Sequence, residues 1–164
     1  MISVVLLWLT LAAAPPPNPS AQQIIDQLAP PASERVTGVR TRSLRNLAPA
    51  ARAIDMNVQF EFASARITGE GSETLQQLAI AMKAPQLSSM RFMIEGHTDA
   101  KGTAKYNLDL SGRRAQSVVA YLRSQGIDTT RLESVGKGFN ELLNEDDPLA
   151  AENRRVRIVA LSEP

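Results

Sequence analysis

The distribution of proline divides this chain into two unequal parts. Seven of the ten prolines precede residue 50, and each one removes a backbone N–H that a helix or a sheet would use. The seven are Pro15, Pro16, Pro17, Pro19, Pro30, Pro31 and Pro49. Residues 15–54 are therefore predicted to form a semi-rigid linker arm, with room for one short helical turn at residues 24–28. Extensive regular structure is expected only in residues 55–162.

The second half of this predicted arm is rich in arginine. Residues 34–52 carry five arginines against a single acidic residue, Glu34. The five are Arg35, Arg40, Arg42, Arg45 and Arg52. Two interpretations stay open: a solvated, weakly ordered arm, or a dedicated docking segment.

The first 14 residues resemble an export signal. Residues 2–14 are uncharged and mostly apolar, and they end in Ala12-Ala13-Ala14. An apolar run of this length is short for a membrane span and suits the core of a signal peptide. However, no Lys or Arg precedes it, and Pro15 disfavours cleavage directly after Ala14. Residues 1–14 are predicted to be a signal peptide or a retained N-terminal anchor.

Composition excludes several classes of site. The chain has no cysteine, which rules out disulfides, thiolate metal sites, a cysteine nucleophile and a lipid-modified cysteine. A single histidine, His97, rules out a multi-histidine metal site. A net charge of +1 and 4% aromatic residues give no reason to expect a nucleic-acid partner. No metal or other cofactor is predicted.

From residue 55 the hydrophobic pattern alternates between strand and helix periodicity. Strands are predicted at residues 57–62, 90–95, 132–137 and 155–161, and helices at residues 70–83 and 105–125. A loop with an acidic centre is predicted at 138–151. The order β-α-β-α-β-β predicts an α+β fold, a two-layer sandwich in which helices cover one face of a small mixed sheet.

The densest polar cluster, residues 96–102, lies between the second strand and the second helix. Asp99 in this loop offers an anionic acceptor, and Asn107, Ser111 and Arg114 share one face of the helix that follows. A carboxylate and a guanidinium on opposite sides of a cleft suit a zwitterionic ligand. A plain salt bridge is the alternative interpretation.

Catalysis is not predicted at this cluster. His97 next to Asp99 suggests a dyad, but a dyad needs a nucleophile or a metal as third member. Ser64 and Ser111 are the only nearby candidates for a nucleophile, and no nucleophile-elbow motif surrounds either of them. His97 is interpreted as a packed or hydrogen-bonding loop residue.

Three consecutive motifs resemble the OmpA-like domain family. They are Phe92-x-Ile94-x-Gly96-His97-Thr98-Asp99-x-x-Gly102, then Asn107-x-x-Leu110-Ser111-x-x-Arg114-Ala115, and finally Asn153-Arg154-Arg155-Val156-x-Ile158. With the residues between and around them, the resemblance extends over about residues 55–160 in order and with compatible spacing.

The resemblance implies a non-enzymatic domain that binds peptidoglycan through the diaminopimelate of the stem peptide. In this family the aspartate and the helix arginine at the positions of Asp99 and Arg114 bind its ammonium and carboxylate. Thr98, Asn107, Leu110 and Arg155 match supporting pocket positions. The implied location is the periplasm, in association with the outer membrane or the cell wall, where the arm would reach outer-membrane or other envelope proteins.

One departure from the family pattern keeps a second hypothesis open. The family's first strand often ends Phe-Asp, whereas this chain has Phe62-Ala63. The change removes a carboxylate from the pocket edge, although a backbone contact from residues 63–65 would survive it. The alternative function is therefore an adaptor in an envelope complex whose peptidoglycan pocket is degenerate.

Overall fold

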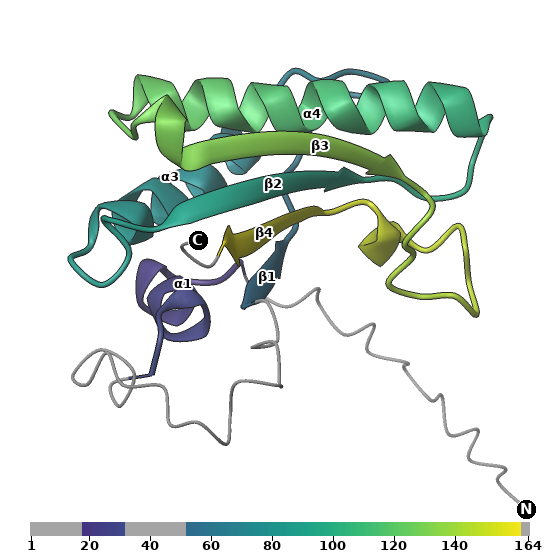
Figure 1. Ribbon diagram of the computed structural model, residues 1–164. Coiled ribbons are helices and arrows are strands. Elements are labelled where there is room, and N and C mark those ends of the chain that lie inside the picture. The colour runs from purple at the N-terminus through teal and green to yellow at the C-terminus, as the bar shows by residue number, and fades with distance from the viewer. Residues whose placement is uncertain (1–17, 32–51, 162–164) are drawn as a thin grey trace, which may run out of the picture.

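The computed structural model describes residues 18–31 and 52–161 (Figure 1). Its helices and strands are α1 (Ala21–Leu28), β1 (Ala53–Met56), α3 (Gly69–Lys83), β2 (Arg91–His97), α4 (Ala104–Ser124), β3 (Leu132–Gly138) and β4 (Val156–Leu161). Two short 3-10 helices, η2 (Thr129–Arg131) and η3 (Ala151–Asn153), precede β3 and β4. The predicted β-α-β-α-β-β order is confirmed.

The four strands form one mixed sheet in the order β1-β4-β2-β3. β2 and β3 are parallel and are joined through α4, as a parallel pair requires a crossover connection. β4 lies between β1 and β2 and is antiparallel to both. The last strand of the chain therefore lies at the centre of the sheet, which brings the residues just before it to the ends of β1 and β2.

The two long helices are built as the sequence predicts. The side chains of Thr68 and Thr103 cap α3 and α4 by accepting from the backbone N–H groups of Gly71 and Tyr106. An apolar stripe along α3 is buried, and so is one along α4. Their residues are Leu75, Leu78, Ala79 and Met82 on α3, and Ala115, Val118 and Leu122 on α4. These stripes pack on the sheet face that carries Phe92 and Ile94, both wholly buried.

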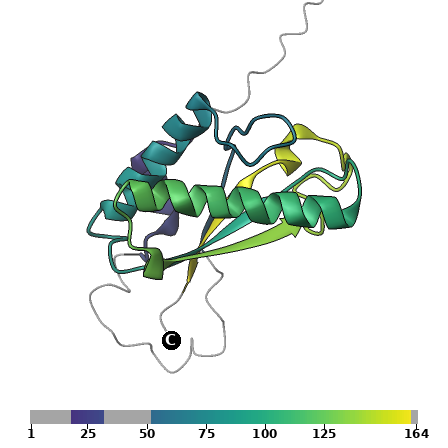
Figure 2. The same cartoon turned by 90° about the horizontal axis from the view of Figure 1, so that it is seen from above.

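Glycines allow α4 to lie unusually close to the sheet, along β3 (Figure 2). A Cβ on Gly96 would lie 2.2 Å from the carbonyl oxygen of Ser111, and one on Gly136 would lie 2.4 Å from the nitrogen of Gly112. Both distances are too short for any real side chain. The absence of a Cβ at these positions therefore sets the depth at which α4 packs and places its N-terminal half beside the ends of β2 and β3.

The first strand begins earlier than its alternation predicts. β1 spans Ala53–Met56, whereas the prediction placed it at residues 57–62. Val58 is buried, but Phe60 makes only an isolated bridge with Ile67, and Phe62 is 98% exposed. The alternating residues lie beyond the sheet, where Phe60 and Ile67 pair across a small turn. The alternation therefore indicated extended backbone correctly but did not indicate whether that backbone joins the sheet.

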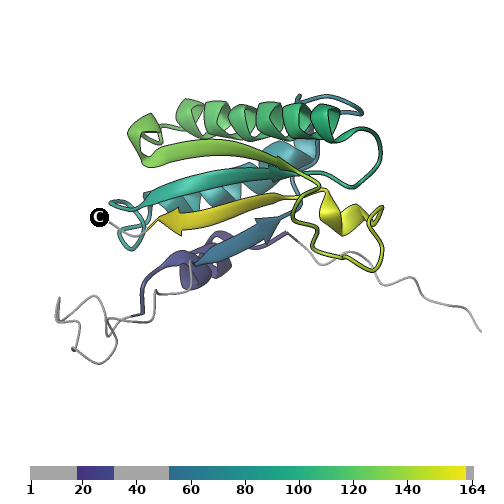
Figure 3. The same ribbon diagram turned by 45° about the vertical axis from the view of Figure 1, so that its right-hand side comes forward.

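Within the segment predicted as a linker, residues 18–31 are ordered around the helix α1, which packs on the domain. Ser20 and Gln23 make a capping box at the start of α1, and Ile24 and Leu28 are completely buried in the common core. α1 contacts α3 and also lies beside β1 at the sheet edge (Figure 3). Asn18 adds a hydrogen bond of 2.7 Å to Thr74 of α3.

Other parts of the predicted N-terminal region lie outside the described residues. They include the export signal at residues 1–14 and the arginine-rich stretch except Arg52. Within the described ranges, no helix combines the length and apolar character needed to cross a membrane.

Candidate functional site

A pocket of about 250 Å³ opens where β1 and β2 end and β4 begins. Its lining comes from three separate parts of the chain and one helix face. The lining residues are Asn57, Val58, Gln59, Phe60, Gly96, His97, Arg114, Ala151, Arg154, Arg155 and Val156. Three arginines and no acidic residue line it, so its wall is suited to an anionic group.

Arg114 projects from α4 into this pocket and is held on one side only. Its Nε donates to the backbone oxygen of Ser64 at 3.0 Å, and its guanidinium lies 4.9 Å from the centre of the Phe60 ring. Among the described residues, nothing hydrogen-bonds its two terminal nitrogens. Burial lowers the pKa of Arg114, which nevertheless stays charged at neutral pH. The side chain therefore presents a positioned fork of N–H donors to the pocket.

Asp99 is paired with an arginine other than the one predicted. Its Oδ2 accepts from Arg154 Nη1 at 2.8 Å, and its Oδ1 accepts from the backbone N–H of Lys101 at 3.2 Å. Asp99 is outside the pocket lining, whereas Arg154 belongs to it. The structure thus brings Asp99, Arg154 and Arg114 to one end of the sheet, with Arg154 as the present partner of the carboxylate.

The supporting residues predicted on the loop and helix lie behind the pocket wall. Thr98, Asn107 and Leu110 are all buried, and none of them lines the pocket. Asn107 Nδ2 donates to the backbone oxygen of Lys101 at 2.9 Å, and the backbone N–H of Thr98 donates to Gly138. These contacts fix the 98–103 loop that carries Asp99.

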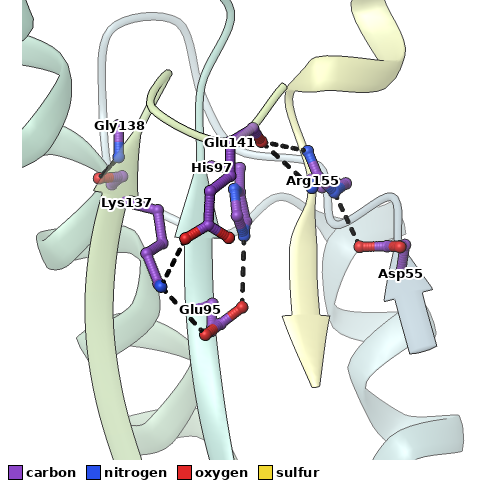
Figure 4. A network of polar contacts seen from close by, with 8 residues as sticks. Asp55, Glu95, His97, Lys137, Gly138, Glu141 and Arg155 are labelled. Carbon is purple, nitrogen blue, oxygen red and sulfur yellow. Dashed lines mark hydrogen bonds and ion pairs between the residues drawn. The ribbon is translucent and has the colours of Figure 1, made fainter. Parts of the chain in front are cut away.

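Arg155 lines the pocket and is deeply embedded beside it (Figure 4). It is 6% exposed, its Nε donates to Asp55 Oδ1 at 2.7 Å, and both terminal nitrogens donate to the backbone oxygen of Glu141 at 3.3 Å. All three of its donor groups are therefore engaged. Arg155 joins β1, β4 and the loop after β3 into one pocket floor.

Several pocket residues were not predicted from the sequence. Arg154 appeared only within the Asn-Arg-Arg motif, and Phe60 appeared only as a strand residue. No sequence signal marks Phe60, because its contact with Arg114 joins parts of the chain that are far apart in sequence. The contact from Ser64 to Arg114 is a backbone contact of the kind expected to survive the change to Ala63.

His97 does not form a dyad with Asp99. It is 2% exposed, and its nearest charged neighbour is Glu95, whose Oε2 lies 3.6 Å from His97 Nε2. Burial and the nearby charge of Arg155 lower the pKa of His97. Among the described residues, the Asp99 carboxylate bonds to Arg154 and Lys101 instead.

Comparison with known proteins identifies the family of the fold. Residues 59–156 match the model of the OmpA family. An outer membrane protein A from Bordetella avium is 40% identical over 115 residues, covering 68% of this chain and 58% of that protein. A peptidoglycan-associated lipoprotein from Pseudomonas aeruginosa is 38% identical over 101 residues, covering 60% and 58%. The chain thus spans less than two thirds of each of these relatives.

Solved structures agree with this match. The peptidoglycan-associated lipoprotein from Burkholderia pseudomallei superposes with a TM-score of 0.54 at 32% identity, covering 63% of this chain and 88% of that one. The cell wall anchor of the T6SS from Pseudomonas aeruginosa superposes with a TM-score of 0.56 at 26% identity, covering 68% and 81%. With the family match across most of the folded part and the same architecture in these structures, the chain belongs to the OmpA family.

Proposed function

We propose that this chain binds peptidoglycan non-covalently through the diaminopimelate of the stem peptide and thereby tethers a component of the cell envelope to the wall. The observation that carries the proposal is the pocket beside Arg114, whose guanidinium is positioned by Ser64 and Phe60 while its terminal nitrogens point to no partner among the described residues.

The free end of diaminopimelate carries an ammonium and a carboxylate. Arg114 can bind the carboxylate through two parallel hydrogen bonds, because its fork of donors matches the spacing of the two oxygens. Burial of Arg114 makes this charged pair stronger than it would be in open water, since fewer solvent molecules compete for the guanidinium.

Asp99 supplies the acceptor for the ammonium. Arg154 neutralises Asp99, whose side chain is only 15% exposed, so the carboxylate is not left without a positive partner. The ligand ammonium would replace Arg154 at Asp99, while Arg154, already in the pocket lining, would turn toward the ligand carboxylate. Charge stays balanced through the exchange, and no covalent step is involved.

The names of relatives support the same function at a coarser level. Three of the proteins described above are named as peptidoglycan-associated or as a cell wall anchor, and another as an outer membrane protein. By extension, this chain acts in the periplasm at the outer membrane or cell wall, as a binding protein rather than an enzyme.

Sedimentation with purified sacculi tests the proposal. Asp99→Ala and Arg114→Ala should each weaken binding about tenfold to a hundredfold, because each removes charged hydrogen bonds of about 1.5–3 kcal/mol. Arg113→Ala is the matched control, since Arg113 neighbours Arg114 on α4 but pairs with Asp109 at the surface. If the variant with both Asp99→Ala and Arg114→Ala sediments with sacculi as well as the Arg113→Ala control does, the proposed site is wrong.

A second function is favoured by one observation, the exposure of Phe62. This aromatic side chain is 98% exposed on the turn that also holds Ala63 and Ser64, beside the pocket. A protein partner in an envelope complex would cover it, as expected of an adaptor. If Phe62→Ser abolished co-purification of an envelope protein while the isolated chain bound no sacculi, the adaptor function would replace the first.

A further inference from the structure

A second polar cluster lies on the sheet face opposite α3 and α4 (Figure 4). Glu95 and His97 project from β2, Lys137 projects from the neighbouring strand β3, and Glu141 reaches back from the loop after β3. Of these residues only His97 also borders the pocket described above. The proposed peptidoglycan site does not use the cluster.

The oxygen and nitrogen atoms of this cluster converge. One oxygen from Glu95, one from Glu141 and one ring nitrogen of His97 all lie within 4.8 Å of one another. The Lys137 ammonium sits between the two carboxylates, 2.7 Å from Glu141 and 3.6 Å from Glu95. The protein thus already places one positive charge of its own among these donors.

His97 provides an independent indication that the cluster is built for a ligand. Its side chain is completely buried, and neither ring nitrogen has a hydrogen-bond partner among the described residues. An imidazole buried without partners is costly, because both nitrogens lose their bonds to water. A metal ion at Nε2 would satisfy the nitrogen that faces Glu95.

We propose that Glu95, His97 and Glu141 form a binding site for a divalent transition-metal cation such as Zn²⁺, and that Lys137 is the internal cation that the metal displaces. One imidazole with two carboxylates is a donor set that zinc accepts, leaving a fourth position for water. Electrostatic balance favours the exchange, since a divalent ion between two carboxylates replaces a single ammonium.

Only modest movement is needed to form this site. Donors around a tetrahedral zinc lie roughly 3.4 Å apart, given bonds of about 2.0–2.1 Å. The three donors must therefore close in from their present separation of up to 4.8 Å. Glu95 and His97 are fixed on β2, whereas the Glu141 side chain is 50% exposed and can rotate inward. The exposed side of Glu141 also gives the ion a path from solvent.

Calorimetric titration of Zn²⁺ into the untagged, metal-free full chain tests this proposal. One equivalent should bind. His97→Gln and Glu141→Gln should each weaken binding by at least about tenfold, as expected when a direct metal ligand is lost. Glu145→Gln is the matched control, because Glu145 is an exposed carboxylate in the same loop and outside the cluster. Lys137→Ala should strengthen binding severalfold, because it removes the competing ammonium.

A second measurement detects coordination of Zn²⁺ by His97 in the unsubstituted protein. His97 is the chain's single histidine, so the imidazole ¹⁵N spectrum contains one residue, and Zn²⁺ should shift one of its two nitrogen signals. Any one of four results would overturn the proposal. Zn²⁺ would fail to bind one-to-one, or the imidazole spectrum would not shift. Alternatively, Glu141→Gln would bind Zn²⁺ as tightly as wild type, or Lys137→Ala would bind it more weakly. In that case the cluster is only a salt-bridge network centred on Lys137.

Discussion

Ala63 shows how one residue can affect both the stability of the fold and the pocket. It is the only non-glycine residue with a positive φ within residues 18–31 and 52–161, at 50°. Left-handed backbone costs an L-residue with a Cβ roughly 1–2 kcal/mol. The turn that contains Ala63 directs the Ser64 carbonyl at Arg114, so the strained residue lies next to the contact that positions the guanidinium.

Replacing Ala63 with glycine should stabilise the protein. Glycine adopts this backbone without strain, and after its larger unfolded-state entropy is subtracted the free energy of unfolding should rise by roughly 0.5–1 kcal/mol. Denaturant unfolding measures the change. Ala65→Gly is the matched control and should lower stability, because Ala65 has no positive φ to relieve. Equal effects of the two substitutions would contradict this explanation.

Among the elements, α4 packs on β2 and β3 so closely that no side chain fits at Gly96 or Gly136. A Cβ on Gly136 would lie 2.6 Å from the backbone oxygen of Leu108 and 2.7 Å from Ser111 Oγ. Ser111 Oγ also accepts from the backbone N–H of Gly138, so the same contact region ties the end of β3 to the helix.

Gly136→Ala should therefore displace α4 and destabilise the fold by about 1–3 kcal/mol or more, as overpacking does. Thermal or denaturant unfolding checks this. Gly69→Ala is the control, because a Cβ at the start of α3 meets nothing within 4 Å and should leave stability unchanged or higher. A Gly136 variant as stable as wild type would show that α4 can move outward freely.

α1 is the element whose assignment to the domain can be tested most directly. Leu28 is wholly buried, so Leu28→Ala should lower the free energy of unfolding by about 2–5 kcal/mol. The matched substitution Leu143→Ala, at a leucine that is 53% exposed, should change stability far less. If wild type and Leu28→Ala gave indistinguishable unfolding curves, residues 18–31 would belong to the linker and not to the folded domain.

At the scale of the whole molecule, the pocket depends on distant parts of the sequence. The segment after β1, the end of β2 and the segment entering β4 meet because β4 inserts between β1 and β2. A ligand in the pocket contacts all of these segments at once. Binding should consequently stabilise the complete fold rather than one loop.

A diaminopimelate-containing stem peptide should raise the melting temperature in a concentration-dependent way. At a ligand concentration of 100 times Kd the expected stabilisation is about 2.7 kcal/mol, since only the folded protein binds. Differential scanning calorimetry measures the shift. The Asp99→Ala, Arg114→Ala double variant should show none over the same concentrations, and a similar shift in both proteins would place the ligand elsewhere.

The sequence predicted best those helices and strands whose hydrophobic pattern depends only on neighbouring residues. The helices predicted at 70–83 and 105–125 and the strand predicted at 155–161 are found within one residue of those bounds, because they depend on local periodicity and burial. β1 was misplaced because its four residues are too few to show alternation, whereas the turn after it shows alternation without a sheet partner. Arg154 at Asp99 was missed since that pair is 55 residues apart in the chain.

The docking of α1 has a mechanical consequence for any load that enters the domain from the N-terminal side of the chain. A pulling force from the N-terminal side would act on α1 before it acts on β1, because α1 packs on α3 and on the edge of the sheet. If α1 is peeled away, residues 18–31 become slack, and an extended chain of that length spans up to about 50 Å. Release of the contact between α1 and the domain would then lengthen the connection before the sheet itself carries load.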